Sequence, residues 1–200
     1  MESLATASGL SIRQMKEWGE ILSGFECRNK YIVLDQDGRE LYYVGEQPGM
    51  LFLRLFLKAV RPFKMDIFKP NQIRALRLSR PFRFFFHELF VFDNQGRPLG
   101  KIERRFSLLR RIYSLYDSSG KETAQLFGPI LHPWTFEIRQ GGQACGMITK
   151  KWSGLAKEMF TDADNFGVTF PSGWDPPSKA LLLGAVFLID FVHFENKNNS

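Results

Sequence analysis

The sequence predicts a mainly β protein, a closed antiparallel barrel of about ten to twelve strands around a hydrophobic C-terminal helix. Three observations predict this class. Phenylalanine supplies 20 of the 200 residues, and aromatic side chains favour half-buried pleated surfaces. Turn signals of one form recur between short apolar runs. Near the end of the chain, the segment from Ala180 to Phe194 contains only two polar side chains, Asp190 and His193.

Composition and charge indicate a folded domain with a negatively charged partner. Hydrophobic residues make up 44% of the chain and charged residues 24%, so the composition is not that of a disordered protein. The net charge of +6 favours lipid headgroups or nucleic acid as partners. Cys27 and Cys145 are too few for a disulfide scaffold or a four-thiolate zinc site. The acidic, non-apolar N-terminus is unlike a signal peptide, which predicts a cytoplasmic protein.

Residues 1–24 are expected to precede the barrel as a tail and a short helix. Met1–Ser11 has no hydrophobic period, which predicts a loose tail. Gly24 suits the end of a helix. The barrel domain is then expected over residues 25–195, with a disordered tail over 196–200. The apolar residues at helical spacing are Ile12, Met15, Trp18, Ile21 and Leu22.

Short strands joined by tight turns are expected from Tyr31 to Phe170. Asp35–Gly38, Asp93–Gly96 and Asp117–Gly120 share the form Asp-x-x-Gly. Asp at the first position of a type I turn accepts backbone hydrogen bonds, and Gly tolerates the positive φ that follows, so each turn predicts a hairpin. An internal repeat with a gapless offset of 46 residues indicates a duplicated hairpin. Its matched pairs are Phe90 and Phe136, Gly96 and Gly142, Gly100 and Gly146, and Ile102 and Ile148.

The C-terminal apolar segment is expected to form a helix over residues 178–194 inside the barrel. Its apolar side chains cover every face of a helical wheel, so it must be buried in protein or in lipid. A length of about 22 Å is short for a hydrocarbon layer of about 30 Å, which favours a protein core. Prolines 176–177 precede the helix, and Asp175 or Ser178 would cap it. Asp190 is then expected near one barrel mouth, beside a backbone or Arg partner.

Three segments of the second half of the chain resemble the phospholipid scramblase family. They are Trp152–Gly154, Phe160–Gly167 and Leu183–Phe191, and the resemblance extends from about Leu22 to Glu195. It implies a tubby-like barrel of twelve strands around the C-terminal helix. It also implies calcium-dependent, ATP-independent, bidirectional movement of phospholipids between leaflets. The implied location is the inner face of the plasma membrane, with peripheral or single-helix attachment.

The segment Asp162–Gly173 contains the candidate metal ligands. Asp162, Asp164 and Gly167 match positions 1, 3 and 6 of an EF-hand loop, whereas Gly173 stands where a bidentate Glu would close the shell. The family resemblance implies weak Ca²⁺ binding here, with Asp162 and Asp164 as ligands. The alternative is a turn between two strands in which the Asp side chains cap backbone N–H groups.

Eight arginines are candidate lipid-binding residues. An Arg near an anionic bilayer surface contributes about 1 kcal/mol to binding, and Phe84–Phe86 would enter the interface as a wedge. The same stretch would suit a nucleic-acid backbone, or it would be a barrel strand with solvated Arg and inward Phe. The candidates are Arg74, Arg77, Arg80, Arg83, Arg104, Arg105, Arg110 and Arg111.

Enzyme signatures are missing from the sequence. His87, His132 and His193 are each without a second His at metal spacing, and neither a nucleophile elbow nor a phosphate loop occurs. Three functions remain open: a scramblase, an anionic-lipid or phosphoinositide-binding module without transport, and a nuclear or nucleic-acid-binding regulator. Transport needs polar groups along a route through the bilayer, which a helix enclosed in a barrel does not supply. Scrambling would therefore require the helix to leave the barrel, or the protein to oligomerise.

Overall fold

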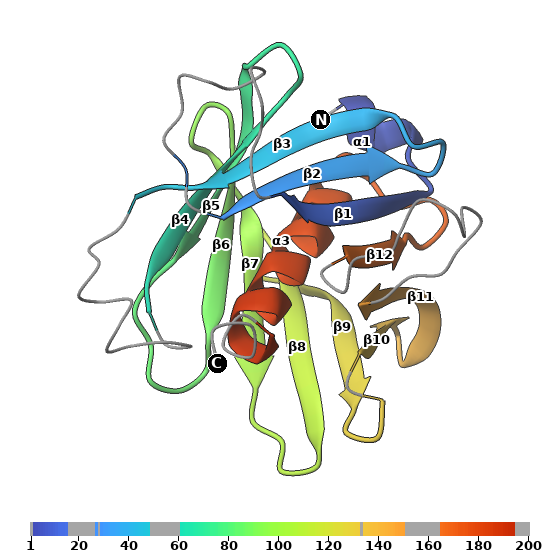
Figure 1. Ribbon diagram of the computed structural model, residues 1–200. Helices are drawn as coiled ribbons and strands as arrows, with labels where there is room; N and C mark the ends of the chain where they lie inside the picture. The colour runs from blue at the N-terminus through green and yellow to red at the C-terminus, as the bar shows by residue number, and fades with distance from the viewer. Residues whose placement is uncertain are drawn as a thin grey trace.

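The computed structural model describes residues 2–15, 27, 29–48, 61–132, 134–150 and 165–194. These residues form a closed barrel of antiparallel strands around helix α3 (Pro176–His193), with the short helix α1 (Glu2–Thr6) at one end (Figure 1). Each strand pairs with the next along the chain, and β1 closes the barrel between β2 and β12. The strands are β1 (Gly9–Met15), β2 (Lys30–Asp35), β3 (Glu40–Glu46), β4 (Phe63–Phe68), β5 (Arg74–Arg80), β6 (Glu88–Asp93), β7 (Pro98–Arg105), β8 (Arg110–Asp117), β9 (Glu122–Pro129), β10 (Thr135–Gln140), β11 (Gln143–Lys150) and β12 (Asn165–Thr169).

The three Asp-x-x-Gly turns have the predicted geometry. In each turn the Gly N–H donates to the Asp carbonyl oxygen at 3.0–3.2 Å, and the Gly φ lies between 79° and 83°. One carboxylate oxygen of the Asp also accepts from the second and fourth residues that follow it, at 2.8–3.1 Å. The turn sequence therefore specifies each hairpin locally. The turns are Asp35–Gly38, Asp93–Gly96 and Asp117–Gly120.

Strand β1 shows that the helix predicted from Ile12 is wrong where the structure describes it. Ile12 and Met15 lie in a strand in which Leu10 and Ile12 are buried and the intervening Ser11 is half-buried. The three-residue spacing of Ile12 and Met15 suggested a helix, but pairing with both β2 and β12 selects the extended form. The barrel accordingly begins at Gly9 and not at residue 25. The later positions of that prediction, and the tail over 196–200, lie outside the described residues.

The duplicated hairpin is offset differently on its two strands. Ile102 faces Leu89 across β6–β7, and Ile148 faces Phe136 across β10–β11. The second strands are therefore 46 residues apart as predicted, but the first strands are 47 apart. The difference arises in the turns, because Gly141–Gly142 makes a shorter connection than the corresponding Asp-x-x-Gly turn.

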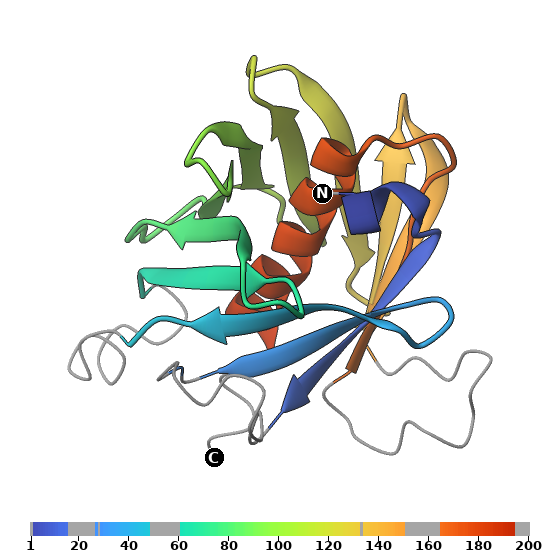
Figure 2. The same cartoon turned by 90° about the horizontal axis from the view of Figure 1, so that it is seen from above.

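Helix α3 runs through the centre of the barrel, as the apolar segment predicted (Figure 2). The Asp175 carboxylate caps its N-terminus by accepting from the Ser178 N–H at 2.9 Å. All side chains from Lys179 to Phe191 are buried. By length and composition alone α3 would suit a membrane span, but 72% of that stretch is buried inside the protein. Its apolar faces are therefore covered by the strands.

Helix α1 occupies the barrel end at which α3 begins, where a loose tail was predicted. The Lys179 ammonium donates to the carbonyl oxygens of Leu4, Ala5 and Ala7 at 3.0, 3.0 and 2.8 Å. Leu4 itself is fully buried in the core. These bonds satisfy carbonyls that the end of a short helix leaves without partners, so α1 is fixed to α3.

Candidate functional site

At the opposite end of the barrel, three neighbouring loops expose large apolar side chains. They connect β5 to β6, β7 to β8 and β9 to β10, and Figure 1 shows them at the end where α3 finishes. We call this end the loop mouth. Phe85 is 78% exposed, Leu108 83% and Leu131 89%. Large apolar side chains that are exposed together on neighbouring loops are typical of an interaction surface. The apolar loop tips are Phe84, Phe85, Phe86, Phe106, Leu108, Leu109, Ile130 and Leu131.

Two of the eight candidate arginines lie away from this mouth. Arg74 begins β5 at the α1 end of the barrel, where its guanidinium donates to the Asn94 carbonyl oxygen at 3.4 Å. Arg77 lies on the outer wall, and its Nε donates to Asp66 Oδ1 at 2.8 Å. The Asp66 carboxylate offsets the charge of Arg77. The basic stretch that is continuous in sequence is therefore not continuous in space.

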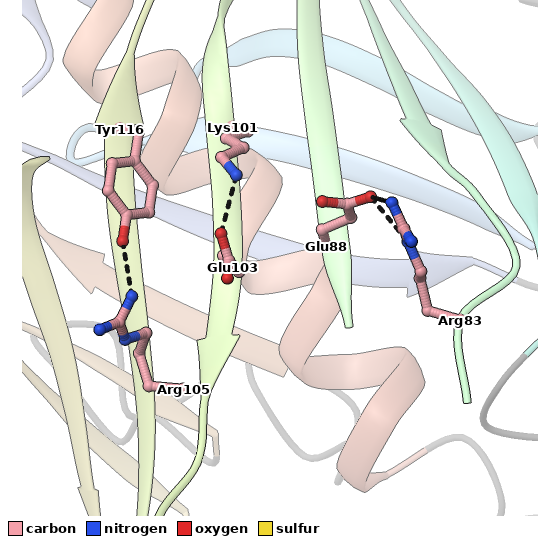
Figure 3. Close-up of polar contacts among 6 residues, drawn as sticks. All are labelled: Arg83, Glu88, Lys101, Glu103, Arg105 and Tyr116. Atoms are coloured by element: carbon pink, nitrogen blue, oxygen red, sulfur yellow. Dashed lines mark hydrogen bonds and ion pairs between the residues drawn. The ribbon is translucent and has the colours of Figure 1, made fainter. Parts of the chain in front are cut away.

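The charge of Arg83 is also offset on the outer wall. Glu88 and Glu103 face one another across β6 and β7, where two like charges repel. Arg83 donates to Glu88 at 2.6 Å, and Lys101 donates to Glu103 at 2.7 Å (Figure 3). These two ion pairs neutralise the carboxylates.

Arg105 and Arg110 project outward at the loop mouth beside the exposed loops. Arg105 Nη1 donates to the Tyr116 hydroxyl at 3.0 Å (Figure 3). The Arg110 guanidinium lies 4.9 Å from the centre of the Phe127 ring. Neither contact adds a negative charge, so both arginines keep their positive charge at the rim of the mouth.

Arg80, Arg104 and Arg111 instead face the inside of the barrel. Ile102 and Tyr113 are fully buried against the core, and side chains two residues along a strand share a face, so Arg104 and Arg111 are directed inward. Both are half-buried, whereas Arg80 is only 2% exposed. The sequence offered Arg80 as a surface residue, but its place in β5 puts it inside the barrel.

Two histidines complete this inward group, which we call the inner basic cluster: Arg80, His87, Arg104, Arg111 and His193. His87 Nδ1 lies 2.8 Å from Arg80 Nη2. Arg111 donates to the backbone carbonyls of the β9–β10 connection at 3.1 Å and lies 4.5 Å from the centre of the Phe136 ring. The histidines are isolated in the sequence, because only the barrel brings His87, at the end of the β5–β6 loop, near His193 at the end of α3.

Burial and neighbouring charge keep both histidines neutral. Burial, with Arg80 and then Arg104, lowers the pKa of His87 to about 4. Burial, with Arg111 and then Arg104, lowers the pKa of His193 to about 3. The His193 Nε2 lies 2.8 Å from the Tyr113 hydroxyl, which fixes the ring at the mouth. The cluster therefore carries the charge of its arginines at neutral pH.

The carboxylates inside the mouth already have cationic partners. Asp190 accepts from Tyr31 at 3.0 Å and from Lys150 at 3.4 Å. It lies near a mouth as predicted, and its partners include a lysine and a tyrosine. Glu46 is bonded to Arg61, and this ion pair is buried. Both carboxylates thus take part in ion pairs with cations outside the inner basic cluster.

The candidate calcium ligands Asp162 and Asp164 lie outside the described residues. Phe166 and Gly167, which match positions 5 and 6 of the loop, lie in β12 and pair with β1 and β11. Phe166 is buried, so this half of the segment is a barrel strand and not an EF-hand loop. Within the described ranges, no three His, Cys, Asp or Glu side chains converge as a metal site.

Of the apolar loop tips, the sequence analysis predicted only Phe84–Phe86, which are exposed in the β5–β6 loop. A different signal would have found the β7–β8 loop. Phe106, Leu108 and Leu109 stand between Arg104–Arg105 and Arg110–Arg111. Large apolar residues bracketed by cations suit a loop that enters a bilayer interface.

Comparisons with known proteins agree on one family. The family model for Scramblase matches residues 1–196. Phospholipid scramblase 1 of Mus musculus is 32% identical, covering 100% of this chain and 65% of that protein. Phospholipid scramblase 2 of Bos taurus is 31% identical, covering 98% and 71%. The chain thus spans about two thirds of the length of these relatives.

One solved structure shares the architecture. The X-ray structure of a protein from Arabidopsis thaliana superimposes with a TM-score of 0.56 at 11% sequence identity. The match covers 95% of this chain and 94% of that protein. At this identity the likeness concerns the fold alone. The predicted tubby-like barrel of twelve strands is confirmed.

Proposed function

This chain belongs to the Scramblase family, and we propose that it binds phospholipid bilayers through the loop mouth and moves phospholipids between leaflets. The observation that supports the binding step is the set of apolar loop tips on three adjacent loops. Arg105 and Arg110 lie at their rim, and no carboxylate among the described residues is bonded to them. Apolar side chains at the tip of a surface and cations behind them match the hydrocarbon and headgroup layers of an anionic membrane.

The aliphatic residues among the loop tips favour a bilayer over nucleic acid. Proteins that bind single strands stack aromatic rings on successive bases along a basic groove. Leu108, Leu109 and Leu131 have no ring to stack, and they are among the most exposed apolar residues. Phe86 also has a φ of 52°, an unfavourable backbone conformation for a bulky residue. Strain of this kind, in a loop that exposes Phe to water, is typical of a functional position.

The buried position of α3 limits how such a barrel would transport lipid. A single closed barrel with α3 in place offers no polar path across a bilayer. We therefore assign the docked barrel to one leaflet, and transport to a state in which α3 leaves the barrel or several copies assemble. Calcium dependence, independence of ATP, movement in both directions and location at the inner face of the plasma membrane belong to the proposal through the family alone.

Vesicle flotation followed by a leaflet assay tests both steps. The full chain should float with vesicles that contain anionic lipid at low salt, and less well with phosphatidylcholine alone. In reconstituted liposomes, dithionite should bleach inner-leaflet fluorescent lipid faster when the protein and calcium are present, without ATP. Failure to float with anionic vesicles would overturn the whole proposal. Flotation without accelerated bleaching would leave a lipid-binding module without transport.

A further inference from the structure

On the inside of the loop mouth, the cations that the structure describes outnumber the carboxylates. Among the described residues, five cationic side chains face two carboxylates there, which leaves an excess of three positive charges with both histidines neutral. Arg61 and Lys150, which lie outside the inner basic cluster, form ion pairs with these carboxylates. The cations are Arg61, Arg80, Arg104, Arg111 and Lys150, and the carboxylates are Glu46 and Asp190.

Arg104 is central to this excess. Within the described part of the chain, its guanidinium makes neither a hydrogen bond nor an ion pair, although its backbone N–H donates to the His87 carbonyl at 2.8 Å. Its charge acts on both His87 and His193, so it lies within electrostatic range of both rings. A half-buried guanidinium that has lost part of its water without gaining an acceptor is costly. An anion bound at Arg104 would remove that cost.

We propose that the inner basic cluster binds the phosphate group of an anionic phospholipid whose headgroup enters the loop mouth. Guanidinium groups bind phosphate through paired hydrogen bonds, and Arg104 and Arg111 come from adjacent strands on the same inner face. Arg80 and His87, which contact one another, add positive potential and a ring nitrogen. Arginines arranged in this way suit a tetrahedral oxyanion better than a neutral headgroup.

The position of the cluster favours a lipid as the source of the phosphate. It lies on the inner face of the barrel end that carries the apolar loop tips, so it would face the headgroup layer whenever those tips enter a bilayer. This inference rests on the proposed docking of the loop mouth. A soluble phosphate compound has the same binding chemistry, so the experiment separates the two sources.

The barrel supplies matched control variants for the test. Arg104 and Arg105 are neighbours on β7 but face opposite sides of the wall, as do Arg111 and Arg110 on β8. Arg104→Gln and Arg105→Gln therefore remove the same charge at the same depth in a membrane. Only the first substitution removes a donor from the inner basic cluster.

The first measurement follows the imidazole resonances of His87 and His193 by NMR while inorganic phosphate replaces chloride at constant ionic strength. A phosphate held by the cluster should raise the pKa of both rings along a saturating curve. Arg104→Gln should weaken that response about tenfold, the loss expected for a charged hydrogen bond, and Arg105→Gln less than about twofold. Unchanged ring pKa values, or equal effects of the two variants, would overturn the phosphate site.

The second measurement uses vesicles of phosphatidylcholine with and without phosphatidic acid. The wild-type chain should prefer vesicles with phosphatidic acid. Arg105→Gln should weaken that preference only by the contribution of one rim charge, about fivefold, whereas Arg104→Gln should weaken it clearly more. If both variants bind anionic vesicles alike, the docking of the loop mouth stands and the phosphate site falls. If the chain responds to inorganic phosphate but ignores all vesicles, the lipid source and the proposed function both fall.

Discussion

Replacing Leu108 and Leu109 together by Ser tests whether the loop mouth enters a membrane. Both residues lie in the β7–β8 loop, where their side chains are 83% and 76% exposed and contribute little to the folded core. The double substitution should therefore change the free energy of unfolding by less than about 0.5 kcal/mol. Loss of membrane binding by this variant would not be caused by unfolding.

The expected loss follows from the exposed fraction. Transfer of a whole Leu side chain out of water contributes about 1.5–3 kcal/mol. Taking the lower value, because an interface is less apolar than a core, the exposed parts of two side chains contribute about 2 kcal/mol. This corresponds to a loss of about 30-fold in the vesicle partition coefficient.

Titration with anionic vesicles, read by flotation, measures that coefficient. Ile73→Ser is the matched control, because Ile73 is 56% exposed in the β4–β5 turn at the opposite end of the barrel. It should leave partitioning unchanged. The reasoning is refuted if the double variant binds as tightly as wild type, or if Ile73→Ser weakens binding to the same extent.

Three further predictions concern the barrel itself. His87 and His193 have folded-state pKa values of about 4 and about 3, against 6.5 when unfolded, so the unfolded state binds more protons as acid is added. The free energy of unfolding should be constant above pH 6.5. Between about pH 6 and pH 4 it should fall by up to about 1.4 kcal/mol per pH unit for each histidine. Urea titrations that give the same free energy of unfolding across this pH range would contradict the prediction. Gly100→Ala should lower the free energy of unfolding by more than about 2 kcal/mol, because Gly100 has a φ of +149° and an added Cβ would overlap a carbonyl oxygen of β8. Gly141→Ala has open space around it and should lower the free energy by only about 1 kcal/mol. Calorimetry that finds Gly141→Ala the more destabilising of the two would refute this reasoning. Lys179→Met should lower the melting temperature, because it removes hydrogen bonds to the α1 end that contribute about 1–3 kcal/mol to the free energy of unfolding. An unchanged melting temperature would show that this side chain does not hold α1 in place.

Local sequence chemistry determined the turns and the central helix. Asp93 and Gly96 fix their hairpin through bonds between residues at most four apart, so no distant contact is needed to predict it. The segment that became α3 was apolar on every face, and its predicted length of about 22 Å was short for a bilayer, which favoured burial inside the protein. Strand β1 could not be predicted in the same way, because its conformation depends on β2 and β12, which are remote in sequence.

The candidate site was predictable only in part. The arginines were found as residues, but the sequence gives no means of telling that Arg105 faces outward and Arg104 inward. Phe84–Phe86 was predicted as a membrane-entering segment, but its grouping with the apolar tips of two other loops, and the grouping of the histidines, could not be predicted, since these residues come from separate hairpins and from the end of α3. Asp162 and Asp164 remain a prediction from the family resemblance.

The sequence by itself determined the class of this protein, namely strands joined by Asp-x-x-Gly turns around an apolar helix. Its net charge of +6 also led us to predict an anionic partner. Only the tertiary structure decided which side of the barrel wall each arginine occupies and which loops share one mouth. The physical reason is the two-residue repeat of a strand. A shift of one position reverses the face of every side chain, and long-range strand pairing sets that position.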